Sequence, residues 1–204
     1  MEVFKILIAI IIGYLLGSIP WALVIGKLFY KTDVRKYGSH NLGGTNVCRV
    51  INKKAGYTVI FLDASKAFFA ALIVSWFAGT TAIALGGFAA AMGHCYPLFA
   101  NFKGGKAVSS TFGYLIAISI LITHDPLTCI VPGLIFFMFL GLTRMVSVAS
   151  MVGIFSAWLY ALVFSSNSLI KAILLFLALF VIYRHKKNIN RIINKKESKI
   201  RILK

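Results

Sequence analysis

Acidic residues are scarce in this 204-residue chain, which has five Asp and Glu against 22 Lys and Arg. Side-chain sites for Mg²⁺ or Ca²⁺ use carboxylates, and glycosidases use a pair of them. The five acidic residues form no cluster, and neither an HExxH nor a GxSxG motif occurs. We therefore expect no metal, no cofactor and no nucleophile elbow.

Cysteine and charge are also limited. The three cysteines have no CxxC spacing, which predicts neither a disulfide framework nor a zinc site. Charged residues make up 13% of the chain, against about 25% in soluble proteins. Hydrophobic residues make up 59%, the mean hydropathy is +0.87, and several apolar stretches are long enough to span a bilayer. The basic residues are not on a soluble domain, so nucleic-acid binding is not expected.

These features predict an all-α, polytopic integral membrane protein with one domain, residues 1–204, that ends in a basic tail at 184–204. A single Lys precedes the first apolar run and no small-residue cleavage site follows, so we expect a retained helix. Breaks in the hydrophobic pattern place seven transmembrane helices. Their approximate bounds are 3–29, 55–78, 82–96, 107–123, 127–142, 146–164 and 169–183.

The basic residues fall on alternate connections between these helices. One side of the membrane receives the first polar loop (residues 30–54), the second polar loop (residues 97–106), the turn 143–145 and the tail, which hold nearly all Lys and Arg. The opposite turns, 79–81, 124–126 and 165–168, hold none. The positive-inside rule then predicts an N-terminus outside and a cytoplasmic C-terminus. It also predicts that the polar segments share the cytoplasmic face.

The first polar loop contains a glycine-studded stretch, residues 38–49, with three glycines, two hydroxyls, two side-chain amides and an arginine. Glycine lets backbone N–H groups approach a ligand closely, and a run of such groups binds anions. Ser, Thr, Asn and Arg add donors that suit phosphate oxygens. The structural alternative is a glycine-rich turn with a helix cap.

The second polar loop places two lysines around Gly104-Gly105, directly before a helix. Backbone N–H groups, a helix N-terminus and ammonium charges together favour an anion. No Walker A pattern fits, and the alternative is a basic loop that only sets topology.

Four further features have a structural or a functional interpretation. Arg144 is expected at a membrane edge, where a single arginine usually serves as a topology anchor. If the tail is helical, His185 and Asn188 share a face, and the histidine could accept a proton near neutral pH. The remaining basic tail is expected to bind anionic lipid. Asp63 and Lys66, three residues apart in an apolar zone, are predicted to pair as a structural brace.

Four motifs follow one another along the chain: Gly-Ser-x-Asn-x-Gly-x-Thr-Asn-x-x-Arg, His-x-x-Pro with Phe-Lys-Gly-Gly-Lys, Arg-x-x-Ser-x-Ala-Ser and Tyr-Arg-His-x-x-Asn-Ile. Together they resemble the bacterial acyl-phosphate:glycerol-3-phosphate acyltransferase (PlsY) family over essentially the whole chain. The resemblance implies a seven-helix enzyme of the bacterial cell (inner) membrane with a cytoplasmic active site. It would move a fatty acyl group from acyl phosphate to the 1-hydroxyl of glycerol 3-phosphate, giving lysophosphatidic acid and phosphate, the first acylation step of phospholipid synthesis.

The resemblance also implies partners and site residues. The partners are glycerol 3-phosphate, fatty acyl phosphate, membrane lipids and the soluble phosphate acyltransferase that makes acyl phosphate. The implied catalytic residues are Ser39, Arg49, His185 and Asn188. The implied substrate-binding residues are Asn41, Thr45, Asn46, His94, Lys103, Gly104, Gly105, Lys106, Arg144 and Ser147. The chain departs from the family at four positions. The family usually has Gly at position 40, Ala at 44, Gly at 107 and Glu at 187, and this chain has His40, Gly44, Ala107 and Lys187 there.

The residues are consistent with this reaction. An acyl phosphate is an activated mixed anhydride, so we expect no covalent intermediate and no metal. The site must hold a hydroxyl about 3–3.5 Å from the acyl carbon and stabilise the oxyanion and phosphate. His185 or the donor's own phosphate would accept the proton. Substrate assistance is favoured because no carboxylate is placed to orient a histidine.

Two other functions share some of these sequence features. A transporter for a phosphorylated solute would also have seven helices and anion-binding loops, but transporter sites tend to lie near the midplane. A lipid-head-group phosphotransferase would need clustered acids for Mg²⁺.

Overall fold

The computed structural model describes residues 1–200, which contain helices and no strands, as the composition predicts. The chain divides into two compact units, Met1–Ile122 and Thr123–Lys204. Residues 201–204 of the predicted basic tail lie outside the described part.

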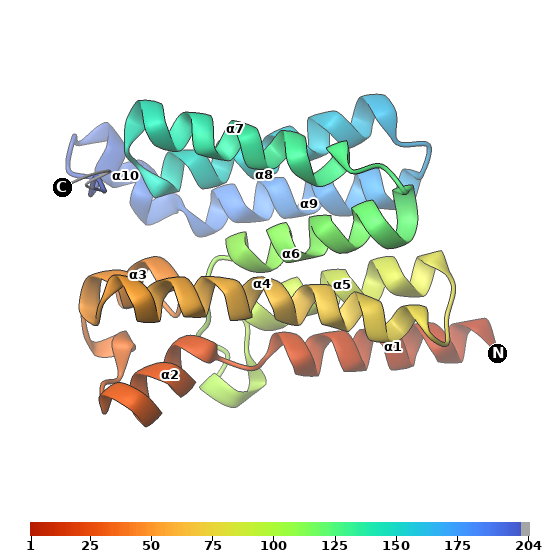
Figure 1. Cartoon of the computed structure of the whole chain (residues 1–204), viewed down its shortest axis with the longest axis horizontal. Helices are drawn as coiled ribbons and strands as arrows, with labels where there is room; N and C mark the ends of the chain where they lie inside the picture. Colours follow the sequence, from red (N-terminus) through yellow and green to blue (C-terminus); the bar gives the residue numbers. More distant parts are fainter. Residues whose placement is uncertain (201–204) are drawn as a thin grey trace. The chain divides into compact units, whose positions relative to one another are not determined.

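Unit 1 contains six α-helices and two short 3₁₀ turns (Figure 1). They are α1 (Glu2–Gly17), α2 (Trp21–Tyr30), η1 (Val34–Lys36), α3 (Gly44–Val50), α4 (Lys53–Ser75), α5 (Thr80–Cys95), η2 (Leu98–Ala100) and α6 (Val108–Ile118). Three of the predicted apolar helices correspond to α4, α5 and α6, the last of which continues into a π-helical turn, Ser119–Thr123.

The predicted first helix is interrupted. Helix α1 ends at Gly17, and α2 begins after Pro20. Proline has no N–H to continue the helical ladder, and its ring crowds the preceding turn. The sequence has small and kinking residues here, and in the structure the chain breaks into two helices at this point.

Small residues bring the helices of unit 1 into backbone contact. A Cβ atom on Gly13 would overlap the Gly86 carbonyl, and one on Gly17 would overlap the Ala90 carbonyl, so α1 and α5 pack closely. Likewise, Gly113 of α6 lies against the backbone of Ala64 in α4. Close approach through small residues is typical of helices that pack in membranes.

Helix α3 lies within the stretch predicted as loop. It begins after Gly43 and docks on α4, where the backbone of Gly56 touches Cys48. Below it, a buried apolar cluster joins α2, η1, α3, α4 and η2; its members are Ala22, Leu23, Ile25, Val34, Leu42, Val47, Ala55, Val59 and Ala100. This cluster gives the two polar loops a common hydrophobic base.

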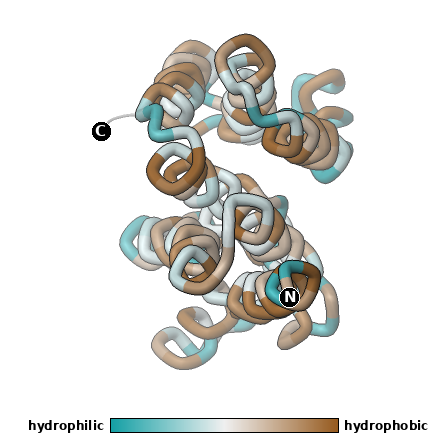
Figure 2. The backbone as a smooth tube through the Cα atoms, turned by 90° about the vertical axis from the view of Figure 1, so that its right-hand side faces the viewer, coloured by the Kyte–Doolittle hydropathy of each residue, from teal (hydrophilic) through white to brown (hydrophobic). Residues whose placement is uncertain are grey.

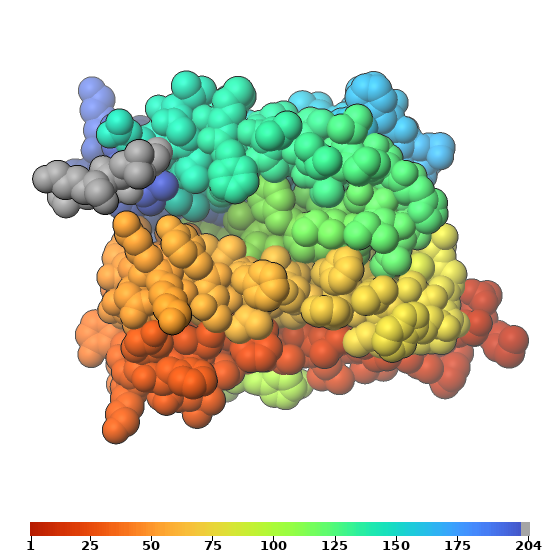
Figure 3. Space-filling view, viewed as in Figure 1, coloured from red at the N-terminus to blue at the C-terminus, as the bar shows by residue number. Residues whose placement is uncertain are grey.

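The two polar loops lie at one end of unit 1. In Figure 1 the N-terminus and the α4–α5 turn lie at the opposite end. The space-filling view shows α2, α3 and the start of α4 (red-orange to orange) as one continuous surface at the loop end (Figure 3). Within unit 1 the two polar loops lie together, because residues of both line one cavity; the side of the membrane that they face stays a prediction.

Unit 2 contains α7 (Leu127–Thr143), α8 (Val146–Phe164), α9 (Ser168–Arg184) and α10 (Lys186–Ile193). The first three match the predicted helices within two residues at each end. Helix α10 follows α9 after a bend of 56° at His185.

Polar caps fix the turns of unit 2. The Asp125 carboxylate accepts hydrogen bonds from the Leu127 amide, the Thr128 hydroxyl and the Tyr160 hydroxyl, at 3.0, 3.1 and 2.8 Å. It thereby caps α7 and ties its start to α8. The Asn167 side chain accepts from the amides of Leu169 and Ile170 and caps α9.

Among the described residues, four helical segments are long and apolar enough to cross a membrane, or five if α9 and α10 count as one bent span. The four are Glu2–Tyr30, Lys53–Ser75, Thr80–Ala100 and Val146–Phe164. Helices α6 and α7 are apolar but shorter. Viewed end-on, the helices are largely coloured as hydrophobic (Figure 2). These lengths and apolar compositions suit an integral membrane protein with several spans.

Candidate active site

Asn46 organises the first polar loop. Its side chain, 2% exposed, accepts a hydrogen bond at 2.8 Å from the Ser39 amide. Its Nδ2 group donates to the carbonyls of Val34, Tyr37 and Asn41, at 2.9, 3.3 and 3.1 Å. These contacts draw the loop around the start of α3. The predicted substrate-binding residue Asn46 therefore has hydrogen-bond partners at each end of its amide inside the loop.

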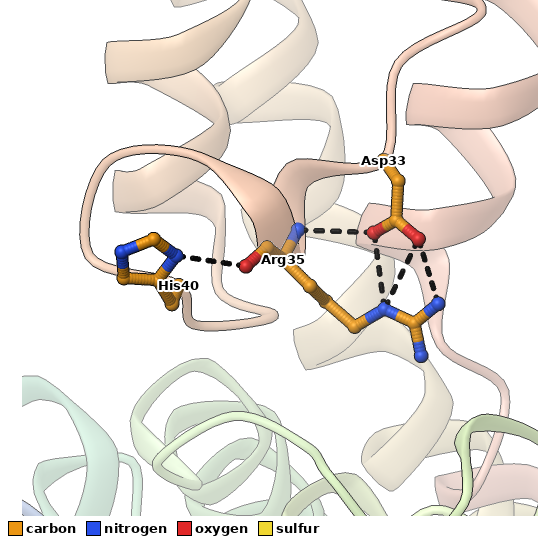
Figure 4. A network of polar contacts seen from close by, with 3 residues as sticks. All are labelled: Asp33, Arg35 and His40. Carbon is orange, nitrogen blue, oxygen red and sulfur yellow. Dashed lines mark hydrogen bonds and ion pairs between the residues drawn. The ribbon is translucent and has the colours of Figure 1, made fainter.

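A charged turn precedes this stretch (Figure 4). The Asp33 carboxylate accepts from the Arg35 backbone amide at 3.0 Å and forms a bidentate ion pair with its guanidinium, with a closest distance of 2.7 Å. These hydrogen bonds hold the pKa of the Asp33 carboxyl at about 2. The Arg35 carbonyl in turn accepts from Nδ1 of His40, at 2.9 Å.

Other predicted residues of the first polar loop are more accessible. Ser39 and Arg49 are exposed, and Thr45 is half-buried. Arg49 lines a cavity of about 430 Å³ together with Thr32, Tyr37, Gly38 and Val50. The Asn41 Oδ1 atom is buried and has no hydrogen-bond partner among the described residues. A buried acceptor without a donor is costly unless a ligand or water supplies one.

The second polar loop folds back on the end of α5. The Gly105 amide donates to the His94 carbonyl at 3.0 Å, and the Gly104 amide donates to the Cys95 carbonyl at 3.1 Å. A Cβ atom on Gly105 would overlap Nε2 of His94, so the imidazole lies directly against this glycine. Side chains at these two glycine positions would not fit. His94 is thus placed as a support beneath the loop.

A buried charge network holds His94. Asp63 Oδ1 lies 2.9 Å from Lys66 Nζ and 3.3 Å from His94 Nδ1, and all three side chains are at most 5% exposed. Lys66 also donates to the Ile19 carbonyl at 2.9 Å, and Ser110 donates to the Asp63 carbonyl. Charges in such surroundings are paired because isolated ones are expensive. The predicted Asp63–Lys66 pair is confirmed, and it connects α4, α5 and α6 with the segment between α1 and α2.

The two polar loops meet at a second cavity of about 370 Å³, lined by Arg35, His40, Lys103 and Gly104. Three of these four residues carry or can carry a positive charge. Lys106 follows as a half-buried residue, and Ala107 caps α6 with a φ of 64°, in the left-handed region that glycine adopts without strain. Residues more than sixty positions apart therefore contribute to one basic hollow.

In unit 2, Glu197 connects several predicted site residues. Its Oε1 accepts from the Ser147 hydroxyl at 2.8 Å and from Nδ2 of Asn188 at 2.6 Å, and its Oε2 accepts from Arg191 at 2.7 Å. Burial raises the pKa of Glu197, but these hydrogen bonds outweigh it, so the pKa lies below its usual range. A carboxylate thus orders Ser147 and Asn188 in one cluster.

His185 and Arg144 flank this cluster in the chain. His185 is 3% exposed, and its Nδ1 lies 2.8 Å from the Val181 carbonyl. Because a carbonyl can only accept, Nδ1 carries the proton, and Nε2 of the neutral ring is an acceptor. Arg144 ends α7 with a φ of 58°, and its carbonyl accepts from the Ile200 amide at 2.8 Å.

Sequence reasoning did not single out Asp33, Arg35, His40 or Glu197 for the site. Glu197 had a usable signal, because it is the only acidic residue in the basic stretch 184–204. The Asp-x-Arg spacing before a turn was a weaker signal of a capped, ion-paired turn. No group of three or more His, Cys, Asp or Glu side chains among residues 1–200 could hold a metal ion.

Several known proteins are similar to this chain. A family model described as glycerol-3-phosphate acyltransferase matches residues 7–195. The chain is 44% identical over 190 residues to a glycerol-3-phosphate acyltransferase of Bacillus cytotoxicus, covering 93% of this chain and 92% of the relative. It is 40% identical over 192 residues to one from Geobacillus kaustophilus, covering 94% of each.

Solved structures give the same result. The chain is similar to the crystal structure of PlsY (YgiH), an integral membrane glycerol 3-phosphate acyltransferase, in its glycerol 3-phosphate form. The TM-score is 0.88 at 36% identity, over 96% of each chain. The lysophosphatidic acid form gives 0.85 at the same identity, over 96% of this chain and 95% of that one.

Proposed function

Because the chain belongs to the glycerol-3-phosphate acyltransferase family, we propose that it transfers a fatty acyl group from a fatty acyl phosphate to the 1-hydroxyl of glycerol 3-phosphate. The products are lysophosphatidic acid and inorganic phosphate. The observation that carries this proposal is the basic hollow where the two polar loops of unit 1 meet. Each proposed substrate bears a phosphate group, and basic, glycine-rich loops are suited to bind phosphate.

We assign the residues of unit 1 as follows. Lys103, Gly104, Gly105 and Lys106 bind the phosphate of the acyl donor, with His94 supporting the loop from beneath. Ser39, Thr45 and Arg49 contact glycerol 3-phosphate. The buried Asn41 Oδ1 atom, which has no donor among the described residues, accepts from a glycerol hydroxyl. Asn46 keeps the loop in shape through its four hydrogen bonds.

We assign the residues of unit 2 to the reacting hydroxyl and the donor. His185 and Asn188 act on the hydroxyl, and Arg144 and Ser147 bind substrate. The protonation of His185 at Nδ1 leaves Nε2 of the neutral ring as an acceptor, which suits a proton acceptor. The departing phosphate is the other candidate for this role.

The reaction needs no covalent enzyme intermediate and no metal, because the mixed anhydride is already activated. The chain supplies positioning of the two reactants and donors for the developing oxyanion and the leaving phosphate. We propose that this occurs at the cytoplasmic face of a bacterial cell membrane, in a protein with seven spans and an outside N-terminus. The acyl phosphate would come from a soluble phosphate acyltransferase.

The test is acyl transfer by purified protein with palmitoyl phosphate and labelled glycerol 3-phosphate. Ser39→Ala, Arg49→Ala and Lys106→Ala should each lower turnover at least 100-fold, since one donor to a developing charge is worth about 10²–10³ in rate. Each variant should still insert in the membrane. Turnover should be insensitive to EDTA. Unchanged rates in all three variants would contradict the assignment of the site residues. Equal rates with acyl-CoA and with palmitoyl phosphate would contradict acyl phosphate as the donor.

A further inference from the structure

His40 occupies a backbone position that suits glycine. Its φ is 58°, in the left-handed region where a Cβ atom crowds the backbone. Glycine would adopt the same conformation without strain. The chain therefore carries a strained residue at the edge of the basic hollow. Compared with a glycine at this position, His40 places an imidazole ring there.

The orientation of the ring is fixed by one hydrogen bond. Nδ1 lies 2.9 Å from the Arg35 carbonyl, which can only accept, so Nδ1 is the protonated nitrogen (Figure 4). Within the part of the chain that the structure describes, Nε2 has no hydrogen-bond partner. When the imidazole is neutral, Nε2 presents a lone pair. When it is protonated, Nε2 presents an N–H group with positive charge.

The surroundings of the ring are cationic. His40 lines the cavity of about 370 Å³ together with Arg35, Lys103 and Gly104. Asp33 neutralises Arg35 through their ion pair and, with its pKa held at about 2, stays ionised near neutral pH. Lysine, arginine and aspartate side chains as a class keep their charge between about pH 6 and 8, whereas histidine is the side chain that changes.

We propose that His40 is a further substrate-binding residue of this chain, whose protonated imidazole donates Nε2–H to a phosphate group held at Lys103 and Gly104. The identity of the phosphate as part of a substrate rests on the proposed function. Phosphate binding should therefore strengthen as pH falls from about 8 to 6, by an amount that depends on His40. The phosphate could belong to glycerol 3-phosphate or to the acyl donor.

Binding is measured first with inorganic phosphate, by calorimetry on the full chain in detergent at about pH 6 and pH 8. Phosphate itself titrates in this range, so the comparison is between proteins at equal pH. At about pH 6, wild type should bind roughly tenfold more tightly than His40→Gly, as expected for a charge-assisted hydrogen bond. At about pH 8 the two should converge. His40→Asn tolerates the left-handed backbone but cannot be protonated, so it should match His40→Gly.

The matched control is His124, which also has a positive φ, 51°, but lies in the turn before α7. His124→Gly relieves the same kind of strain without altering the hollow, and its phosphate affinity should equal that of wild type. Equal affinities of wild type and His40→Gly at about pH 6, or no phosphate binding by wild type, would overturn the proposal.

Kinetic arms identify the source of the phosphate. KM is measured for glycerol 3-phosphate at saturating palmitoyl phosphate, and then for palmitoyl phosphate at saturating glycerol 3-phosphate. The substrate whose KM rises in His40→Gly, with kcat nearly unchanged, is the one that His40 contacts. Two unchanged KM values would contradict the role in substrate binding. Absence of acyl transfer in wild type would instead contradict the proposed function. The phosphate titration would still test whether His40 contributes to phosphate binding.

Discussion

Two asparagines of the first polar loop lie five residues apart and differ in their contacts. Asn46 is buried and makes four hydrogen bonds, all to groups of the loop itself. Asn41 is half-buried, and its Oδ1 has no partner among the described residues. A saturated amide stabilises the loop, whereas a buried acceptor without a donor is suited to receive one from a ligand.

Replacing each asparagine by alanine should separate these roles. Asn46→Ala removes four hydrogen bonds within the loop, so we expect a loss of about 2–4 kcal/mol of stability. Asn41→Ala removes no observed side-chain hydrogen bond, so its stability should stay within about 0.5 kcal/mol of wild type. Its KM for glycerol 3-phosphate should nevertheless rise about tenfold. Thermal unfolding in detergent and steady-state kinetics measure the two effects; the opposite pattern would exchange the two assignments.

The sequence was informative about residue types at this scale but not about their contacts. Glycines, amides and basic residues in residues 38–49 and 103–106 predicted two anion-binding loops. The pairing of Asn46 with the loop backbone depends on α3, a seven-residue helix without a long apolar pattern. The role of Glu197 depends on how the chain returns past α10. No hydrophobic periodicity in the sequence predicts either arrangement.

Backbone contacts between helices position the second polar loop. This loop leads into α6, and α6 packs on α4 where Gly113 meets the Ala64 carbonyl. The loop itself lies on His94, which the buried Asp63 network holds. The position of the loop thus depends on contacts made one or more helical turns away from it.

A methyl group at Gly113 should therefore destabilise the fold. The Ala64 backbone cannot move aside as a side chain can, so we expect Gly113→Ala to cost about 1–3 kcal/mol, as overpacking does. Gly133 of α7 provides the control, because a Cβ atom there meets nothing within 4 Å. Gly133→Ala should be neutral or stabilising by up to about 1 kcal/mol, through helix propensity. Equal unfolding temperatures for the two variants would show that α4 and α6 do not pack as described.

In unit 2, Glu197 joins α8, α10 and the segment after α10 through Ser147, Asn188 and Arg191. Its folded-state pKa is lowered relative to its ordinary value of 4.5. A group with a depressed folded pKa contributes stability above its unfolded pKa, and this contribution is lost as pH falls through the folded value. The stabilisation should therefore be complete near neutral pH and decline below about pH 4.5.

Glu197→Gln should remove this dependence. The amide places a donor where Arg191 or Asn188 also donates, so we expect a loss of about 1–3 kcal/mol near neutral pH. Below the folded pKa the variant and wild type should converge, because the wild-type carboxyl is then protonated and, like the glutamine amide, carries no charge. Unfolding curves at several pH values between about 3 and 7 measure the difference. A difference that is the same at every pH would show that the charge of Glu197 is not what stabilises the cluster.

At the scale of the whole molecule, hydrophobic runs and their breaks predicted seven apolar helices, and α8 begins and ends at the predicted residues. The breaks at Pro20 and at His185 were less predictable. Proline in an apolar run can either kink a helix or end it. The bend at His185 separates two stretches that each satisfy a helical pattern. What sequence cannot supply here is the packing that decides between continuous and broken helices.

Membrane topology is the largest feature that the charge pattern predicts. With a formal net charge of +17 concentrated on alternate connections, the positive-inside rule places the two polar loops and the tail on the cytoplasmic side. Single cysteines in a variant lacking Cys48, Cys95 and Cys129 can be labelled from either side of sealed vesicles. Cysteines at Lys103 and Tyr37 should react from the cytoplasmic side, and cysteines at Thr80 and Ser166 from the other. Because the two polar loops line one hollow in unit 1, labelling of Tyr37 and Lys103 from opposite sides would contradict the fold as well as the topology. Labelling of Thr80 from the cytoplasmic side would contradict the topology alone.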